Sequence, residues 1–252
     1  YVWADALITY LTAIGYPDDP AWTERWAGAQ HLIAKEILKF HGVLWPIMLH
    51  AAGIPLYRAL RVHGYWTLGG QKISKSATNL VDALGLKDVY GFETLRYFML
   101  REMSFGLDAE FSEEALVARI NADLANDLGN LVSRSLGMLG KYFDGRIPDG
   151  RGESELRAKA VQVASDVDRH LRAFSTKQAL ASLWELVGAA NKYVDSSAPW
   201  VLAKDPARKP ELETVMYELF ECIRVIGVLL APFMPQRSAQ ILGALGAEAA
   251  SA

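Results

Sequence analysis

Two lysines and two serines stand close together in the segment KISKS, residues 72–76, directly after a Gly-Gly pair. Ammonium groups bind phosphate as point charges, and serine hydroxyls add hydrogen-bond donors. At the mouth of a parallel sheet, such a loop can clamp a triphosphate and the charge that develops on a leaving pyrophosphate. A solvated surface loop has the same composition. The lysines and serines taken alone favour that second interpretation.

The segments before KISKS predict a sheet edge that would position it. Residues 31–34 (HLIA) are typical of a buried strand, residues 35–53 of a helix that Pro46 kinks or divides, and residues 61–68 of a second strand. Strand, helix and strand in this order predict a parallel βαβ unit. Residues 34–41 and the loop after Leu68 should then open on one edge, where parallel sheets bind ligands. The first residues predict a short strand end followed by a helix.

The pattern becomes helical after Ser112, which precedes Glu113 and Glu114 and is typical of a helix N-cap. One apolar stripe at helical spacing follows, made of Leu116, Ile120, Leu124, Leu128 and Leu131. Further helices are predicted over 155–173, after a capping box at 175–178, and from Pro210. The predicted fold class is α/β plus all-α. The predicted domains are 1–79, a connecting region 80–114, and a helical bundle 115–252.

Composition limits the classes of function. The 252 residues are 51% hydrophobic and carry a net charge of −3, so no global basic field indicates nucleic-acid binding. Residues 115–210 alone carry 14 Lys and Arg against 11 Asp and Glu, a net charge of +3. The single Cys222 excludes an internal disulfide and fits a reducing, cytoplasmic setting. The sequence contains no uninterrupted apolar run of about 18 residues, which is the length that a membrane-spanning helix needs.

Three polar side chains of the helical half could read RNA bases. Asn126, Asn130 and Arg134 are spaced i, i+4 and i+8, which aligns them on one face of an α-helix. Trp200 follows Pro199 after a helix, where an aromatic ring can stack on an unpaired base. Asn130 and Arg134 could equally form a surface pair, and Trp200 an apolar plug. Without further context, the residues favour these structural roles.

The order of motifs along the chain resembles the methionyl-tRNA synthetase family. KISKS differs by one residue from the KMSKS motif of class I aminoacyl-tRNA synthetases. The resemblance runs from residue 1 to about 243, through YVWADALITYLTAIGYPDD, HLIAKEILKFHGVLWPIMLHAAGIPL, HGYWTLGGQKISKS, RINADLANDLGNLVSRSLGM, KYVDSSAPW and LAPFMP. It implies the second half of a Rossmann-like catalytic domain, a stem region and an α-helical anticodon-binding bundle.

The resemblance also implies a reaction and the residues that serve it. Methionine would be activated by ATP, with Mg²⁺ arriving on the nucleotide, and passed to tRNA(Met). The implied catalytic residues are Lys75 and its helper Lys72, with ATP contacts from Ser74, Ser76, Glu36, His63 and Gly64. The implied methionine pocket is Trp3, Ala6, Leu7, Tyr10, Ile37 and His41. The implied anticodon contacts are Asn130, Arg134 and Trp200, to which the helical spacing adds Asn126. No residue here is expected to be a dedicated metal ligand.

Some residues depart from the family pattern. Ala34 and Glu36 stand in AKEI where the family usually has Gly-Lys-Asp-Ile, and Leu7 stands where some members carry proline. The amino-terminal half of the catalytic domain, with its His-Ile-Gly-His motif and an insertion that often binds zinc, is not in this sequence. We therefore expect this polypeptide alone not to form methionyl adenylate. Two alternatives stay open: a non-catalytic tRNA-binding module, and a class I synthetase for leucine, isoleucine or valine.

Overall fold

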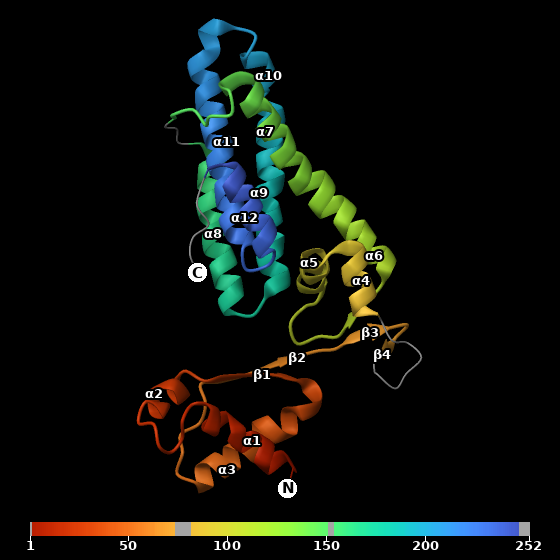
Figure 1. Ribbon diagram of the computed structural model, residues 1–252, viewed down its shortest axis with the longest axis vertical. Coiled ribbons are helices and arrows are strands. Elements are labelled where there is room, and N and C mark those ends of the chain that lie inside the picture. Colours follow the sequence, from red (N-terminus) through yellow and green to blue (C-terminus); the bar gives the residue numbers. More distant parts are fainter. Residues whose placement is uncertain (1, 74–81, 151–153, 247–252) are drawn as a thin grey trace. The chain divides into compact units, whose positions relative to one another are not determined.

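The computed structural model describes residues 2–73, 82–150 and 154–246. Its chain divides into two compact units, residues 1–74 with 105–110, and residues 75–104 with 111–252. The first unit holds the strands and the second holds the helical bundle (Figure 1). The observed fold is therefore α/β plus all-α, as the sequence predicts.

The first unit begins with two helices and a parallel βαβ segment. Its elements in order are α1 (Val2–Ala13), α2 (Trp22–Ala27), β1 (Gln30–Ala34), the 3₁₀ turn η1 (Lys35–Ile37), the π-helix η2 (Phe40–Leu44), α3 (Trp45–Ala51) and β2 (Ala59–His63). Strands β1 and β2 pair in parallel from Gln30↔Ala59 to Ala34↔His63. The predicted βαβ unit is confirmed. Pro46 lies in the first turn of α3, where the π-helix η2 gives way to an α-helix, but the backbone stays helical from Lys35 to Ala51, so Pro46 does not divide the predicted helix. From Val2 onward the first segment is helical, without the predicted strand end.

The predicted single strand 61–68 is wrong, because the chain breaks at Gly64 into two strands of different sheets. β2 stays beside β1, while β3 (Trp66–Leu68) joins β4 (Gln71–Lys72) and β5 (Ala109–Glu110) in the order β4-β3-β5. A Cβ on Gly64 would lie 2.1 Å from the carbonyl oxygen of Leu107. Only glycine admits this close backbone approach, and the chain bends there.

The core of the first unit lies between α1, α2 and α3. It is formed by Leu7, Leu11, Trp26, Trp45, Leu49 and Ile54. These side chains repeat at helical spacing on α1 and α3, so each helix buries one stripe. The indole nitrogen of Trp26 donates to the carbonyl of Pro55 at 2.7 Å, which satisfies the one polar atom of that ring.

The second unit is all helical in its described part. Its elements are α4 (Ala83–Tyr90), α5 (Phe92–Glu102), α6 (Glu113–Arg119), the π-helix η3 (Ile120–Gly129), α7 (Asn130–Phe143), α8 (Glu155–Arg172), α9 (Thr176–Ser197), α10 (Pro199–Leu202), the 3₁₀ turn η4 (Pro206–Arg208), α11 (Lys209–Leu230) and α12 (Pro235–Ala244). Helices α8, α9 and α11 pack along one another around one apolar core (Figure 1). Helices α6, η3 and α7 follow without a break in one long helix.

Two predicted helix starts have different outcomes. The Ser112 hydroxyl accepts the Ala115 N–H at 3.2 Å, which confirms the predicted N-cap of α6. Ser175 makes no such bond, so the predicted capping box of α9 is wrong. The ψ of Ser175 is 65°, whereas Ser112 has the extended ψ of 133° that is typical of an N-cap. In the tight turn from α8, the Ser175 N–H bonds the His170 carbonyl at 2.8 Å.

The apolar stripe after Ser112 exists, but its middle is not an α-helix. Leu116, Leu128 and Leu131 are buried, whereas Ile120 and Leu124 are half-buried. Residues 120–129 form i→i+5 hydrogen bonds, which widen each turn beyond the α-helical value. Helical periodicity alone does not reveal such a segment. In the described part of the chain, no helix has the length and apolar character needed to cross a membrane.

Candidate functional site

Aromatic side chains from α1 and η2 form one cluster in the first unit, which we call the aromatic site: Trp3, Tyr10, Phe40 and His41. The rings of Trp3 and Phe40 stack with centroids 4.2 Å apart. Tyr10 Oη lies 2.9 Å from His41 Nε2, and His41 Nδ1 lies 3.1 Å from the Ile37 carbonyl. Three of these four residues are predicted methionine contacts, and the fold brings them together.

The aromatic site is apolar, with one polar pair. Trp3 and Tyr10 are each 37% exposed, so their rings border open space, whereas His41 is buried. A thioether is apolar and polarizable and makes favourable contacts with aromatic rings. Leu7 differs from its neighbours because it is fully buried within the core of the unit. Its predicted methionine contact, like those of exposed Ala6 and half-buried Ile37, stays a prediction.

The predicted adenosine contacts lie at the carboxyl ends of the parallel strands. Ala34 at the end of β1 is in register with His63 at the end of β2. Glu36 follows on an exposed turn, and Gly64 follows His63. This register confirms that residues 34 and 63 end at one edge of the β1–β2 sheet. The loop after Leu68 follows β3, which belongs to the other sheet, so its predicted place at that edge stays a prediction.

A charge pair next to that edge was not predicted. Lys35 Nζ lies 2.5 Å from Asp108, whose other oxygen accepts the Tyr65 N–H at 2.8 Å. The bond from Lys35 is the largest of several causes that lower the pKa of the Asp108 carboxyl. Asp108 thus ties the 105–110 segment to the strand ends. The prediction missed it because the two partners are 73 residues apart.

The lysine loop lies largely outside the described residues. Ser74, Lys75 and Ser76 are among the residues not described, and Lys72 is described only as backbone paired with Thr67. The turn that leads into the loop is held by Glu110 of β5. Its carboxylate accepts the Gly70 N–H at 3.2 Å and the Thr67 hydroxyl. The predicted phosphate contacts therefore stay predictions.

In the second unit, three side chains from three helices meet in what we call the Arg134 cluster: Arg134, Asp195 and Trp200. Arg134 of α7 makes an ion pair with Asp195 of α9 at 2.9 Å. The same guanidinium lies over the Trp200 ring, 6.0 Å from its centroid. Trp200 is 39% exposed, so part of its ring faces solvent. Ala198, with φ of 42°, makes the sharp turn that leads into α10, which carries the ring.

The predicted alignment of Asn126 with Asn130 and Arg134 is altered by the π-helix. Asn126 belongs to η3, whereas Asn130 begins α7. In a π-helix a step of four residues falls short of one turn, so Asn126 is rotated away from the position that α-helical spacing predicts. Both asparagines are exposed. Arg134 bonds Asp195, so the alternative of an Asn130–Arg134 surface pair gains no support.

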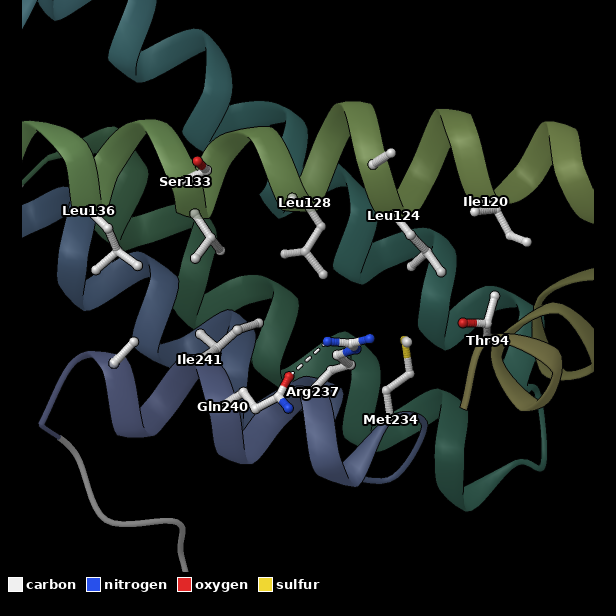
Figure 2. A pocket seen from close by; sticks show the side chains of 14 residues that line it. Thr94, Ile120, Leu124, Leu128, Ser133, Leu136, Met234, Arg237, Gln240 and Ile241 are labelled. Carbon is white, nitrogen blue, oxygen red and sulfur yellow. Dashed lines mark hydrogen bonds between the residues drawn. The ribbon is translucent and has the colours of Figure 1, made fainter. Parts of the chain in front are cut away.

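A groove of about 650 Å³ lies between α12 and the long helix formed by α6, η3 and α7 (Figure 2). Leu124, Leu128 and Leu136 line one side, and Met234, Arg237 and Ile241 line the other. None of the residues predicted to contact ligands lines the groove. Among residues 2–73, 82–150 and 154–246, no cluster of His, Cys, Asp and Glu has the arrangement of a metal site.

Comparison with known families gives two matches. Residues 1–136 match a model described as tRNA synthetases class I (M), and residues 147–251 match the anticodon binding domain of methionyl tRNA ligase. The first match covers more than half of the chain. The chain belongs to the class I methionyl-tRNA synthetases.

Sequence relatives agree with this family. A methionine–tRNA ligase of Caldanaerobacter subterraneus is 46% identical over 252 residues, 98% of this chain and 40% of the relative. The ligase of Bacillus subtilis is 44% identical, again over 98% of this chain and over 38% of its own length. The chain thus spans about two fifths of the length of these curated relatives.

Solved methionyl-tRNA synthetases have the same fold. A Mycobacterium tuberculosis methionyl-tRNA synthetase in complex with methionyl-adenylate is 41% identical and superposes with a TM-score of 0.90, over 96% of this chain and 49% of that one. The apo form of the same enzyme gives a TM-score of 0.90 at 39% identity, over 98% of this chain and 50% of that one.

Within this family assignment, sequence reasoning missed two contacts of the predicted residues. Phe40 stacks on Trp3, and Asp195 pairs with Arg134. Asp195 stands five residues before Trp200 in the segment KYVDSSAPW, which contributes to the family resemblance only as a motif. A carboxylate so close to a predicted RNA-binding tryptophan was the available signal. Phe40 directly precedes His41 and had no signal beyond its type.

Proposed function

We propose that this chain is the carboxyl-terminal part of a methionine–tRNA ligase that acts together with the amino-terminal half of the catalytic domain. The observation that carries the proposal is the Tyr10–His41 pair set among stacked aromatic rings next to the edge of a parallel sheet. An apolar pocket with one directed polar pair suits a thioether side chain. The expected cytoplasmic setting is part of this proposal.

The methionine side chain would lie against Trp3, Tyr10 and His41, with Ala6, Leu7 and Ile37 as further contacts. Trp3 and Tyr10 are each about one third exposed, so both have surface left to cover with a ligand. The polar pair helps to reject an apolar isostere of methionine, because a hydrocarbon leaves polar atoms of the site without a partner.

ATP would bind at the strand ends. His63 and Gly64 are proposed to contact the adenosine, and Lys72, Ser74, Lys75 and Ser76 the phosphates. Glu36 is proposed as a further ATP contact. A methionine carboxylate oxygen would attack the α-phosphorus, and the bond to the bridging oxygen would break as pyrophosphate leaves. The lysines would stabilise the charge that develops on this leaving group. Mg²⁺ would arrive bound to ATP and neutralise the phosphates.

The second step would transfer the methionyl group to tRNA(Met). A hydroxyl at the tRNA 3′ end attacks the carbonyl of the adenylate and AMP leaves. Selection of the tRNA would rest on the Arg134 cluster together with Asn126 and Asn130. The exposed Trp200 offers a face for stacking a base, and the guanidinium of Arg134 is held next to it.

ATP–pyrophosphate exchange by the complete polypeptide that carries this sequence tests the activation step. Each of methionine, leucine, isoleucine and valine is supplied in turn, and we expect exchange only with methionine. A preference for another aliphatic amino acid would support the alternative of a sister class I enzyme.

A matched binding measurement separates the remaining alternative. The same polypeptide is titrated with tRNA(Met) and with a tRNA whose anticodon bases are exchanged. Tight binding of tRNA(Met) without exchange for any amino acid would support a non-catalytic tRNA-binding module and contradict the proposed ligase.

A further inference from the structure

His31 is a buried polar residue in a strand whose inward face is otherwise apolar. It is 6% exposed, and Ile33 lies two residues further along the same inward face of β1. A buried histidine requires hydrogen-bond partners, whereas a buried leucine does not, so the partners of His31 define the orientation of its ring. His31 is not among the residues that the family resemblance implies.

Trp45 fixes the tautomer of His31. The indole Nε1 of Trp45 lies 3.3 Å from His31 Nε2, and an indole nitrogen can only donate. His31 Nε2 must therefore be the unprotonated nitrogen. Trp45 is 1% exposed and belongs to the core, so it is a rigid donor that sets the orientation of the His31 ring.

The His31 ring touches both members of the polar pair in the aromatic site. Its centroid lies 4.5 Å from that of Tyr10 and 5.8 Å from that of His41. Tyr57 covers it from another side, at 4.4 Å and 74°. Such edge-on contacts define ring orientation better than aliphatic packing does.

Tyr57 also holds the backbone that carries His41. Its hydroxyl donates to the His41 carbonyl at 2.7 Å. His41 lies in η2, a π-helix, and π-helical segments are rare and frequent at functional sites. Side chain and backbone of His41 are thus each held by a ring that contacts His31.

We propose that His31 is a positioning residue of the methionine site, which holds Tyr10 and His41 in the relative orientation that distinguishes a thioether from a hydrocarbon side chain. This inference rests on the proposed function and assigns it a residue that acts through the pair rather than on the substrate. A site that rejects an isostere through a polar pair needs that pair fixed within a few tenths of an ångström.

The charge state of His31 agrees with this role. Burial, followed by the nearby His41, lowers the pKa of His31 to about 4. The ring therefore stays neutral at physiological pH, and Nε2 stays free to accept from Trp45. A protonated His31 would carry an N–H at Nε2 that faces the N–H of Trp45, so the hydrogen bond would be lost. It would also place a positive charge next to the apolar pocket.

Two variants of the complete enzyme separate the two properties of the ring. His31→Gln retains an acceptor near the position of Nε2 but loses the ring. His31→Phe keeps a ring but leaves the Trp45 N–H unpaired. Ile33→Val is the matched control, since it removes a methylene from the same face of β1 without changing a ring or a polar atom.

For each variant we measure the KM for methionine and the KM for ATP. We also measure the ratio of kcat/KM for methionine to kcat/KM for norleucine, which we call the methionine-to-norleucine ratio.

We expect both His31 variants to raise the KM for methionine and to lower the methionine-to-norleucine ratio by about tenfold, the equivalent of one lost hydrogen bond. The KM for ATP should stay within about twofold, and Ile33→Val should change none of the three values by more than that.

Two outcomes would overturn the inference. One is an unchanged methionine-to-norleucine ratio in both folded His31 variants. The other is a parallel loss for methionine and ATP that Ile33→Val reproduces, which would make His31 a structural residue only. If the wild-type enzyme activates no methionine at all, the proposed function fails instead, so the two failures are distinguishable.

Discussion

The Tyr10 hydroxyl donates a hydrogen bond to the neutral ring of His41. The Ile37 carbonyl, 3.1 Å from His41 Nδ1, can only accept, so Nδ1 carries the proton of the neutral ring. Nε2 is then an acceptor, and Tyr10 Oη at 2.9 Å is its donor. The direction of this bond follows from a backbone carbonyl four residues away. It defines the polar pair on which the proposed methionine site rests.

Tyr10→Phe should therefore raise the KM for methionine by about three- to tenfold, because it leaves the buried Nε2 of His41 without a partner. The KM for ATP should not change. Steady-state pyrophosphate exchange by the complete enzyme checks this result. Tyr16→Phe is the control, as Tyr16 packs edge-on against Trp22 and makes no contact with His41. Equal effects of both variants would contradict the assignment.

The lowered pKa of His31 predicts a pH-dependent stability of the first unit. An unfolded histidine has a pKa of about 6.5, whereas that of His31 in the folded chain is about 4. Between these values the unfolded chain binds a proton that the folded chain does not. The free energy of unfolding should thus be highest above about pH 6.5 and fall toward pH 4, by at most about 3 kcal/mol.

Urea unfolding followed by tryptophan fluorescence at about pH 7.5 and about pH 5 measures this effect, because Trp26 and Trp45 lie in the core next to His31. Between about pH 7.5 and about pH 5, the free energy of unfolding should fall by about 2 kcal/mol less in the His31→Gln variant than in the wild type. The same loss in both proteins would show that another group causes it.

Trp200→Ala should weaken binding of tRNA(Met) by about 1–3 kcal/mol, which is the usual contribution of a base stacked on an aromatic ring. Methionine activation by the complete enzyme should stay nearly intact. Filter binding and pyrophosphate exchange measure the two properties. Val201→Ala, at a neighbouring residue that is 46% exposed, is the matched control. If activation or folding is lost with Trp200, the ring serves the core and not the RNA.

Asp195→Asn should reduce the preference for the cognate anticodon more than it reduces total tRNA affinity. The carboxylate holds the Arg134 guanidinium beside Trp200, and without it the guanidinium samples several orientations. Binding of tRNA(Met) is compared with that of a tRNA whose anticodon bases are exchanged. Glu185→Gln removes the same charge from an equally exposed ion pair on α9 with Lys159. A uniform gain in affinity for both tRNAs from either variant would indicate a purely electrostatic role.

Gly64→Ala should destabilise the first unit by about 1–3 kcal/mol or more, the cost of inserting a methyl group into a filled space. The new Cβ would lie 2.1 Å from the Leu107 carbonyl oxygen, so the 105–110 segment must move away. Gly28→Ala is the control, because its nearest neighbour would lie at an ordinary 3.7 Å. Equal midpoints of thermal unfolding for the two variants would contradict the close approach.

Local patterns in the sequence predict much of this structure. The Ser112 cap, the apolar stripe after it and the strand–helix–strand order that begins at residue 31 depend on neighbours within a few turns of chain, which periodicity and turn chemistry report. The ordered motifs also indicate the family before any coordinate is considered. The predicted methionine contacts Tyr10 and His41 are brought into contact by the fold, although 31 residues separate them.

Only the tertiary structure decides the remainder, because it depends on groups far apart in the chain. The strand break at Gly64 follows from the approach of Leu107, and the orientation of Arg134 from Asp195, 61 residues away. The π-helix η3 replaces α-helical spacing around Asn126, which no apolar period reveals. The sequence by itself determined the family, the fold class and the types of residue at the site. Packing between distant segments determined which of them face each other.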